Sequence, residues 1–182
     1  DWSPDRTHMW QQNRGVVGHN LKIAWNLMRM YGHLPKPEYE ALAREIFAYG
    51  YGQALELYWT ARRREPAPGE YLSMSWDRIR FLSFNGPFRL GALLGGRPRA
   101  DLRHFEAAGA WLGMAYHLHG DELNLFPRSE QWGKPLADDI TCGRYTYLYL
   151  SAIRLSPPAL KVRLRRALGD RGISAAGLKN VI

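Results

Sequence analysis

Apolar residues recur along this chain at the spacing of α-helices, in segments separated by proline and glycine. In residues 9–31, for example, Val17, Leu21, Ala24 and Met28 follow one another in steps of three and four, which places them on one helical face. The same pattern predicts further helices over residues 38–62, 69–96, 101–125, 143–154 and 158–168. We expect Gly86-Pro87 to kink or divide the third of these helices, and residues 127–140 to form a loop.

Strand patterns are scarce, since long alternation of apolar and polar residues is missing and β-branched residues are few. The chain is therefore predicted to be all-α. Its 182 residues, 46% of them hydrophobic, suit a single domain over 1–182 with a sizeable core. The chain opens on Asp1 and not on methionine, which suggests a fragment or a trimmed chain.

The cysteine content and the hydropathy of the chain indicate in which cellular compartment it works. Cys142 is the one cysteine, so no intrachain disulfide can form, which fits a reducing compartment such as the cytoplasm. No apolar run approaches the roughly 20 residues that a membrane span needs. The first residues also lack the basic and apolar regions of a signal peptide.

The net charge of +8 favours an anionic partner. Much of it lies in Arg62–Arg64 and in the run from Lys161 to Arg166, which also read well as solvated helix faces. Zinc-finger spacing and aromatic RNA-binding patterns are missing, so nucleic acid is not the expected partner.

An acidic cluster ends the helix predicted over 101–125. Asp121 and Asn124 are three residues apart and share a face, with His117 one turn earlier. Asp121 can offer a carboxylate and Asn124 a carbonyl oxygen to a hard cation such as Mg²⁺, whereas Glu122 points about 100° away. The alternative is that these are polar residues ending a helix.

A loop with spaced cations follows. Lys134 and Arg144 flank Asp138-Asp139, and both cations suit phosphate oxygens. Thr146 can donate a hydroxyl. The alternative here is a polar surface loop.

Five segments follow one another in a distinctive order. They are GHNLKIAWNL (Gly18–Leu27), GQALEL (Gly52–Leu57), FRLGALLGG (Phe88–Gly96), LGMAYHLHGDELNL (Leu112–Leu125) and GKPLADDITCGRYT (Gly133–Thr146). Over about residues 18–155, this order resembles that of the trans-isoprenyl diphosphate synthases, or polyprenyl synthetases. In that family, metal-bound allylic diphosphate reacts with isopentenyl diphosphate inside a deep apolar cavity of a helical bundle.

The resemblance implies a helical bundle of the isoprenoid synthase type, truncated at both ends, and a prenyltransferase that uses Mg²⁺. It implies that Asp121 and Asn124 bind the metal, that Asp121 and Lys134 are catalytic, and that Lys134, Arg144, Gln53 and Thr146 bind diphosphate. The expected partners are prenyl diphosphate, isopentenyl diphosphate, and a second copy or another synthase subunit.

Departures from the family pattern put turnover in question. The family's DDxxD motif reads Gly120-Asp121-Glu122-Leu123-Asn124 here, so two of three carboxylates are lost. One alternative is therefore a non-catalytic partner subunit of a prenyl synthase. Another is a fragment of an N-acylglucosamine 2-epimerase-like sugar isomerase, which residues 8–30 also resemble and in which His19 would matter.

Overall fold

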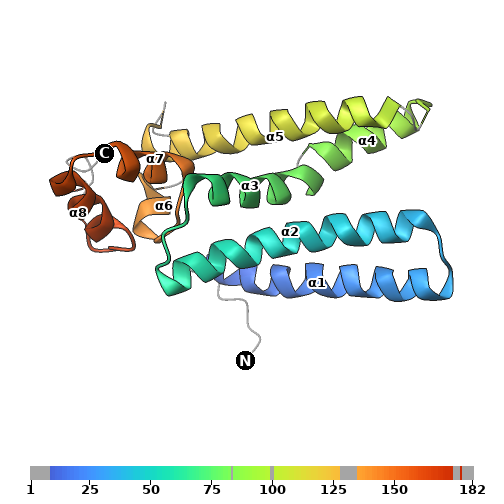
Figure 1. Ribbon diagram of the computed structural model, residues 1–182, viewed down its shortest axis with the longest axis horizontal. Coiled ribbons are helices and arrows are strands. Elements are labelled where there is room, and N and C mark those ends of the chain that lie inside the picture. Colours follow the sequence, from blue (N-terminus) through green and yellow to red (C-terminus); the bar gives the residue numbers. More distant parts are fainter. Residues whose placement is uncertain (1–8, 83, 99–100, 128–134, 174–176, 178–182) are drawn as a thin grey trace. The chain divides into compact units, whose positions relative to one another are not determined.

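The computed structural model describes residues 9–82, 84–98, 101–127, 135–173 and 177. Eight α-helices and no strand occur in these ranges, which confirms the all-α prediction (Figure 1). The helices are α1 (Met9–His33), α2 (Pro37–Arg62), α3 (Pro68–Leu82), α4 (Asn85–Leu94), α5 (Leu102–Leu125), α6 (Asp138–Thr141), α7 (Tyr147–Leu155) and α8 (Pro158–Ala167). Across the described segments, no helix is both long and apolar enough to cross a membrane.

The chain forms two compact units, which are described separately below. Unit 1 comprises Asp1–Leu55 and Trp76–Gly113, and unit 2 comprises Glu56–Ser75 and Met114–Ile182. The prediction of a single domain over 1–182 stays a prediction.

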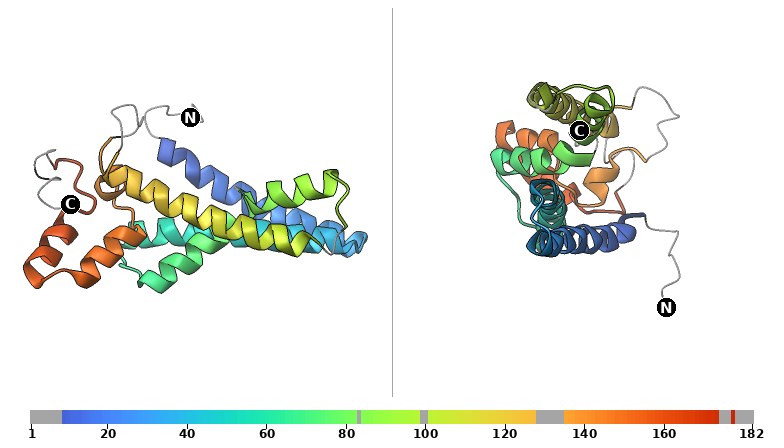
Figure 2. Two further views of the ribbon diagram at one scale, coloured as in Figure 1. Left: turned by 90° about the horizontal axis from the view of Figure 1, so that it is seen from above. Right: turned by 90° about the vertical axis from the view of Figure 1, so that its right-hand side faces the viewer.

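Unit 1 is built on the hairpin of α1 and α2, which run antiparallel beside each other (Figures 1 and 2). A side chain at Gly50 of α2 would meet Leu21 of α1 at 3.3 Å, so glycine permits the close approach of the two helices. The region predicted as one helix over 69–96 is divided, because α3 ends at Leu82 and α4 begins at Asn85. The break falls just before Gly86-Pro87, where proline is tolerated in the first turn of a new helix.

Unit 2 gathers the chemistry-bearing segments. The last turns of α5 lead towards α6, α7 and α8, and α7 packs against α8 (Figure 1). Six helices contribute buried apolar side chains to it: Trp59, Tyr71, Met74, Met114, Ile140, Tyr149, Leu150, Ile153 and Leu164. The prediction of an unbroken loop over 127–140 is wrong at its end, because α6 begins at Asp138. The helix predicted from residue 143 begins at Tyr147, where the Thr146 hydroxyl caps it.

Candidate functional site

The acidic end of α5 is buried and already hydrogen bonded. Asp121 is 8% exposed, and its Oδ2 accepts a hydrogen bond of 2.8 Å from the hydroxyl of Tyr71 on α3. Tyr71 is itself only 2% exposed. A buried carboxylate requires such a donor, because desolvation would otherwise disfavour its charge.

His117 contacts the same Tyr71 hydroxyl from α5. Its Nε2 lies 3.0 Å from the Tyr71 hydroxyl oxygen and 3.4 Å from Oγ of Ser75, and its ring stacks on Tyr71. Tyr71 has one hydroxyl hydrogen, which it gives to Asp121, so its oxygen is left to accept. We therefore assign a proton to Nε2 of His117, which donates to Tyr71. Together Tyr71, Ser75, His117 and Asp121 form what we call the Tyr71 cluster.

The electrostatics of the cluster favour a neutral phenol. Burial, and then the neighbouring Asp121 carboxylate, raise the pKa of Tyr71 far above its ordinary value. Tyr71 is thus a hydrogen-bond donor to Asp121 at any physiological pH.

Asn124 joins α5 to the loop that carries the cations. Its side-chain Oδ1 accepts from the backbone N–H of Asp139 at 3.2 Å, and its main-chain oxygen accepts from the N–H of Ala137 at 2.8 Å. The Asn124 amide Nδ2 is buried and has no hydrogen-bond partner among the described residues. The carbonyl oxygen that the sequence offers to a metal is therefore shared with the loop.

Arg144 is held in place by the two aspartates before it. Its Nη1 lies 3.0 Å from Oδ1 of Asp139 and its Nη2 lies 3.8 Å from Asp138. Burial works against the Arg144 charge, but the Asp139 and Glu56 carboxylates outweigh it, so the pKa of Arg144 is raised. The guanidinium stays charged, and with five N–H donors it can bind further oxygens beyond Asp139.

Three other predicted site residues have different surroundings. Thr146 is buried and its hydroxyl oxygen accepts from the N–H of Tyr149 at 3.2 Å, which leaves its own hydrogen to donate. Gln53, in unit 1, accepts from Asn20 at 3.2 Å and donates to Tyr49 at 3.0 Å. Lys134 lies outside the described residues. The roles assigned to all three stay predictions.

The structure therefore brings three of the predicted residues together, two of them joined by hydrogen bonds through Asp139. Asn124 binds the backbone of Asp139, whose side chain binds Arg144, while Asp121 lies one turn before Asn124 on α5. Within the described ranges, no three His, Cys, Asp or Glu side chains come together to hold a metal ion.

Tyr71 and Ser75 were not identified from the sequence. They lie 46 and 42 residues before His117, and nothing in the local pattern of α3 distinguishes them from other core positions. Their spacing of four residues on one helical face is the only local signal, and many core pairs share it.

Comparison with known proteins agrees with the segment order. The polyprenyl synthetase family matches residues 19–182. A geranylgeranyl pyrophosphate synthase of Rhodocybe pseudopiperita is 33% identical over 111 residues, which cover 58% of this chain and 29% of that protein. A geranylgeranyl diphosphate synthase of Sulfolobus acidocaldarius is 29% identical over 136 residues, which cover 75% of this chain and 41% of that protein.

A short chain isoprenyl diphosphate synthase of Methanothermobacter thermautotrophicus is 28% identical over 119 residues, or 65% of this chain and 36% of that protein. The matched part is thus between 29% and 41% of the length of these curated relatives. No solved structure matches the chain. The match over residues 19–182 and the shared order of motifs show that this chain belongs to the polyprenyl synthetase family.

Proposed function

We propose that this chain binds a prenyl diphosphate and takes part in its condensation with isopentenyl diphosphate, as a prenyltransferase of the polyprenyl diphosphate synthase type. The observation that carries the proposal is the path from Asn124 through Asp139 to Arg144. It holds an always-charged guanidinium beside the acidic end of α5. Family membership and the activities for which the relatives are named suggest the substrate class.

The chemistry assigned to the cations follows from the leaving group. When an allylic diphosphate departs, negative charge develops on its oxygens, and fixed cations stabilise that charge best in a site with little water. Arg144 fits this role because Asp139 orients its guanidinium fork, and a fork can bind two phosphate oxygens at once. Lys134 and Thr146 complete the set of donors in this proposal.

Mg²⁺ is the cofactor that family membership implies, with Asp121 as its carboxylate ligand. When bound, the ion would neutralise diphosphate charge. Asn124 would contribute only by sharing the oxygen that now accepts from Asp139. Because Gly120 and Asn124 replace two family carboxylates, we expect weak metal affinity, with diphosphate binding easier to detect than turnover.

Cytoplasmic location, and assembly as a homodimer or beside another synthase subunit, belong to the same proposal. A non-catalytic partner role is the alternative that the lost carboxylates favour. The polyprenyl synthetase match includes His19 and runs to residue 182, and it therefore favours a prenyl synthase over the epimerase alternative.

Calorimetric titration with geranyl or farnesyl diphosphate, with and without Mg²⁺, tests the binding. Loss of a charge-assisted hydrogen bond costs about 1.5–3 kcal/mol, so Arg144→Gln should raise the Kd roughly tenfold or more. Arg154→Gln, which removes an exposed arginine on α7, is the matched control and should change little. No binding by the unaltered chain, or equal affinities for the two variants, would refute the proposal.

A gain-of-function variant tests the metal ligands. Gly120→Asp with Asn124→Asp restores the family carboxylates, and an aspartate at 124 keeps an acceptor for the Asp139 N–H. We expect this variant to bind Mg²⁺ and diphosphate together more tightly than the natural chain. If its affinity shows no dependence on Mg²⁺, Asp121 is not a metal ligand here.

A further inference from the structure

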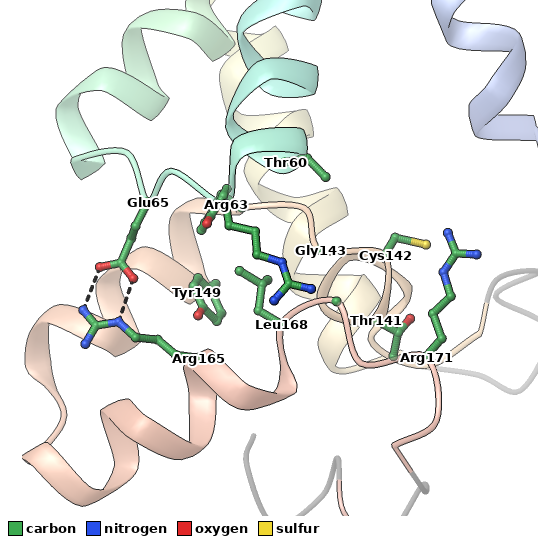
Figure 3. A pocket seen from close by; sticks show the side chains of 12 residues that line it. Thr60, Arg63, Glu65, Thr141, Cys142, Gly143, Tyr149, Arg165, Leu168 and Arg171 are labelled. Atoms are coloured by element: carbon green, nitrogen blue, oxygen red, sulfur yellow. Dashed lines mark hydrogen bonds and ion pairs between the residues drawn. The ribbon is translucent and has the colours of Figure 1, made fainter.

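Unit 2 contains a pocket that the proposed function does not use. It encloses about 510 Å³, which is within the range of small-molecule sites. Residues from the end of α2, the segment around α6, α7 and α8 line it (Figure 3). Arg144 is not among its described lining residues, although its neighbours Gly143 and Tyr145 are.

The pocket is cationic. Arg63, Arg165 and Arg171 line it, against Glu65 as the one carboxylate among its described lining residues. Glu65 is engaged by Arg165 through two hydrogen bonds of 3.0 Å, as Figure 3 shows. Three guanidinium groups and one carboxylate leave the lining with two positive charges in excess.

Arg63 reaches into this pocket from just beyond the last residue of α2 (Figure 3). Its backbone is in the left-handed region, with φ of 49°, where glycine is favoured. An arginine thus occupies a position whose backbone would suit glycine better.

The buried hydroxyl of Tyr149 is a second, independent observation that points to a ligand in this pocket. It is 2% exposed, it lines the pocket, and its hydroxyl has no hydrogen-bond partner among the residues that the structure describes. Burial raises the pKa of Tyr149 well above its ordinary value, so the hydroxyl keeps its hydrogen. A buried donor without an acceptor is unfavourable, and a ligand oxygen would satisfy it.

Two glycines of the pocket lining lie next to each other. Gly143 and Gly169 both have positive φ, and a Cβ added at Gly143 would lie 3.5 Å from the Cα of Gly169. Main chain therefore forms this part of the pocket wall.

We propose that this pocket is a second anion site, separate from the diphosphate site, and that it binds a phosphorylated small molecule through Arg63 and the Tyr149 hydroxyl. A phosphate monoester carries a charge between about −1.5 and −2 near pH 7, which matches the excess charge of the lining. Guanidinium and hydroxyl donors suit phosphoryl oxygens. The remaining volume leaves room for an organic group beside Leu168 and Tyr145.

Inorganic phosphate is the probe, with acetate at matched ionic strength as the comparison and a chelator present throughout. Cys142 lines the pocket and is the one cysteine of the chain, so its alkylation rate reports occupancy. Burial and the Asp138 carboxylate raise the pKa of the Cys142 thiol, so the reaction is run at mildly alkaline pH. We expect phosphate to raise the melting temperature and to slow alkylation several-fold, and acetate to do neither.

Variants separate this site from the diphosphate site. Arg63→Gly should raise the apparent Kd for phosphate about tenfold or more, and glycine suits the positive φ at this position. Arg166→Gln, on the exposed side of α8, should leave that Kd unchanged. Tyr149→Phe should also weaken phosphate binding, yet leave the ligand-free protein as stable as before, because it removes an unsatisfied hydroxyl. Arg144→Gln should leave phosphate protection of Cys142 intact.

Three results would overturn the inference. Phosphate could protect Cys142 no better than acetate does. Arg63→Gly and Tyr149→Phe could both retain natural phosphate affinity. Protection could instead be lost in Arg144→Gln, which would place the anion in the diphosphate site. None of these results depends on prenyl diphosphate binding, so the two proposals can fail separately.

Discussion

The hydrogen bond between Tyr71 and Asp121 should be one of the strongest single contacts in unit 2. The bond is 2.8 Å long, its acceptor is a carboxylate, and both residues are less than 10% exposed. Hydrogen bonds to charged groups contribute about 1.5–3 kcal/mol, and breaking one here leaves a buried carboxylate oxygen without this donor. Tyr71→Phe should therefore lower the free energy of unfolding by about 1.5–3 kcal/mol.

A double-mutant cycle isolates that energy. Tyr71→Phe, Asp121→Ala, which removes the acceptor, and the double variant would be unfolded in urea and followed by circular dichroism. For a chain of this size, each kcal/mol shifts the melting temperature by roughly 2–4 °C, so the Tyr71→Phe shift should be about 3–12 °C. The two substitutions should be clearly non-additive, with a coupling energy above about 1 kcal/mol.

Tyr58→Phe is the matched control, because Tyr58 is 51% exposed. It should change stability by less than about 0.5 kcal/mol. A coupling energy below about 0.5 kcal/mol for the Tyr71 and Asp121 pair would show that the carboxylate does not depend on this phenol. The Tyr71 cluster would then lose its proposed role in holding Asp121.

Two further predictions concern titration and packing. Burial raises the pKa values of Tyr71 and Tyr149, so as the pH rises the unfolded chain loses these phenol protons before the folded chain does. The free energy of unfolding should therefore fall above about pH 10, by roughly 1.4 kcal/mol per pH unit for each tyrosine. Urea titrations across pH 9–11 measure this slope, which Tyr71→Phe should reduce. Gly109→Ala should destabilise the chain by about 1–3 kcal/mol, because the added Cβ would lie 2.9 Å from the Cα of Asn85. Gly120→Ala on the same helix meets nothing within 4 Å and should instead stabilise it by up to about 1 kcal/mol, so equal effects in thermal melts would contradict the packing argument.

The helices were largely predictable because their signal is local. Apolar spacing and proline placed the bounds of α1, α2, α5 and α8 within a few residues of those observed. The short helix α6 was missed, since four residues are too few to show a period and its Asp138-Asp139 start reads as a polar loop. The order of motifs was also sufficient to identify the family, because each motif is a contiguous run of residues.

Site geometry required the tertiary structure. The sequence offered the Asp121 carboxylate and the Asn124 carbonyl oxygen as metal ligands. The structure shows that Asp121 accepts a hydrogen bond from Tyr71 and that Asn124 accepts one from the backbone of Asp139. The sequence pattern does not single out Tyr149, whereas the structure shows that it lines a cationic pocket and that its buried hydroxyl has no partner among the described residues.

By itself, then, the sequence determined the helical class, the family and the residue types available for diphosphate chemistry. These depend on contacts within one or two helical turns and on contiguous motifs. The tertiary structure decided which donors meet which acceptors, because Tyr71 and Asp121 are 50 residues apart and Glu65 and Arg165 are 100 apart. Contacts over such separations are set by the packing of helices, which a local periodicity does not record.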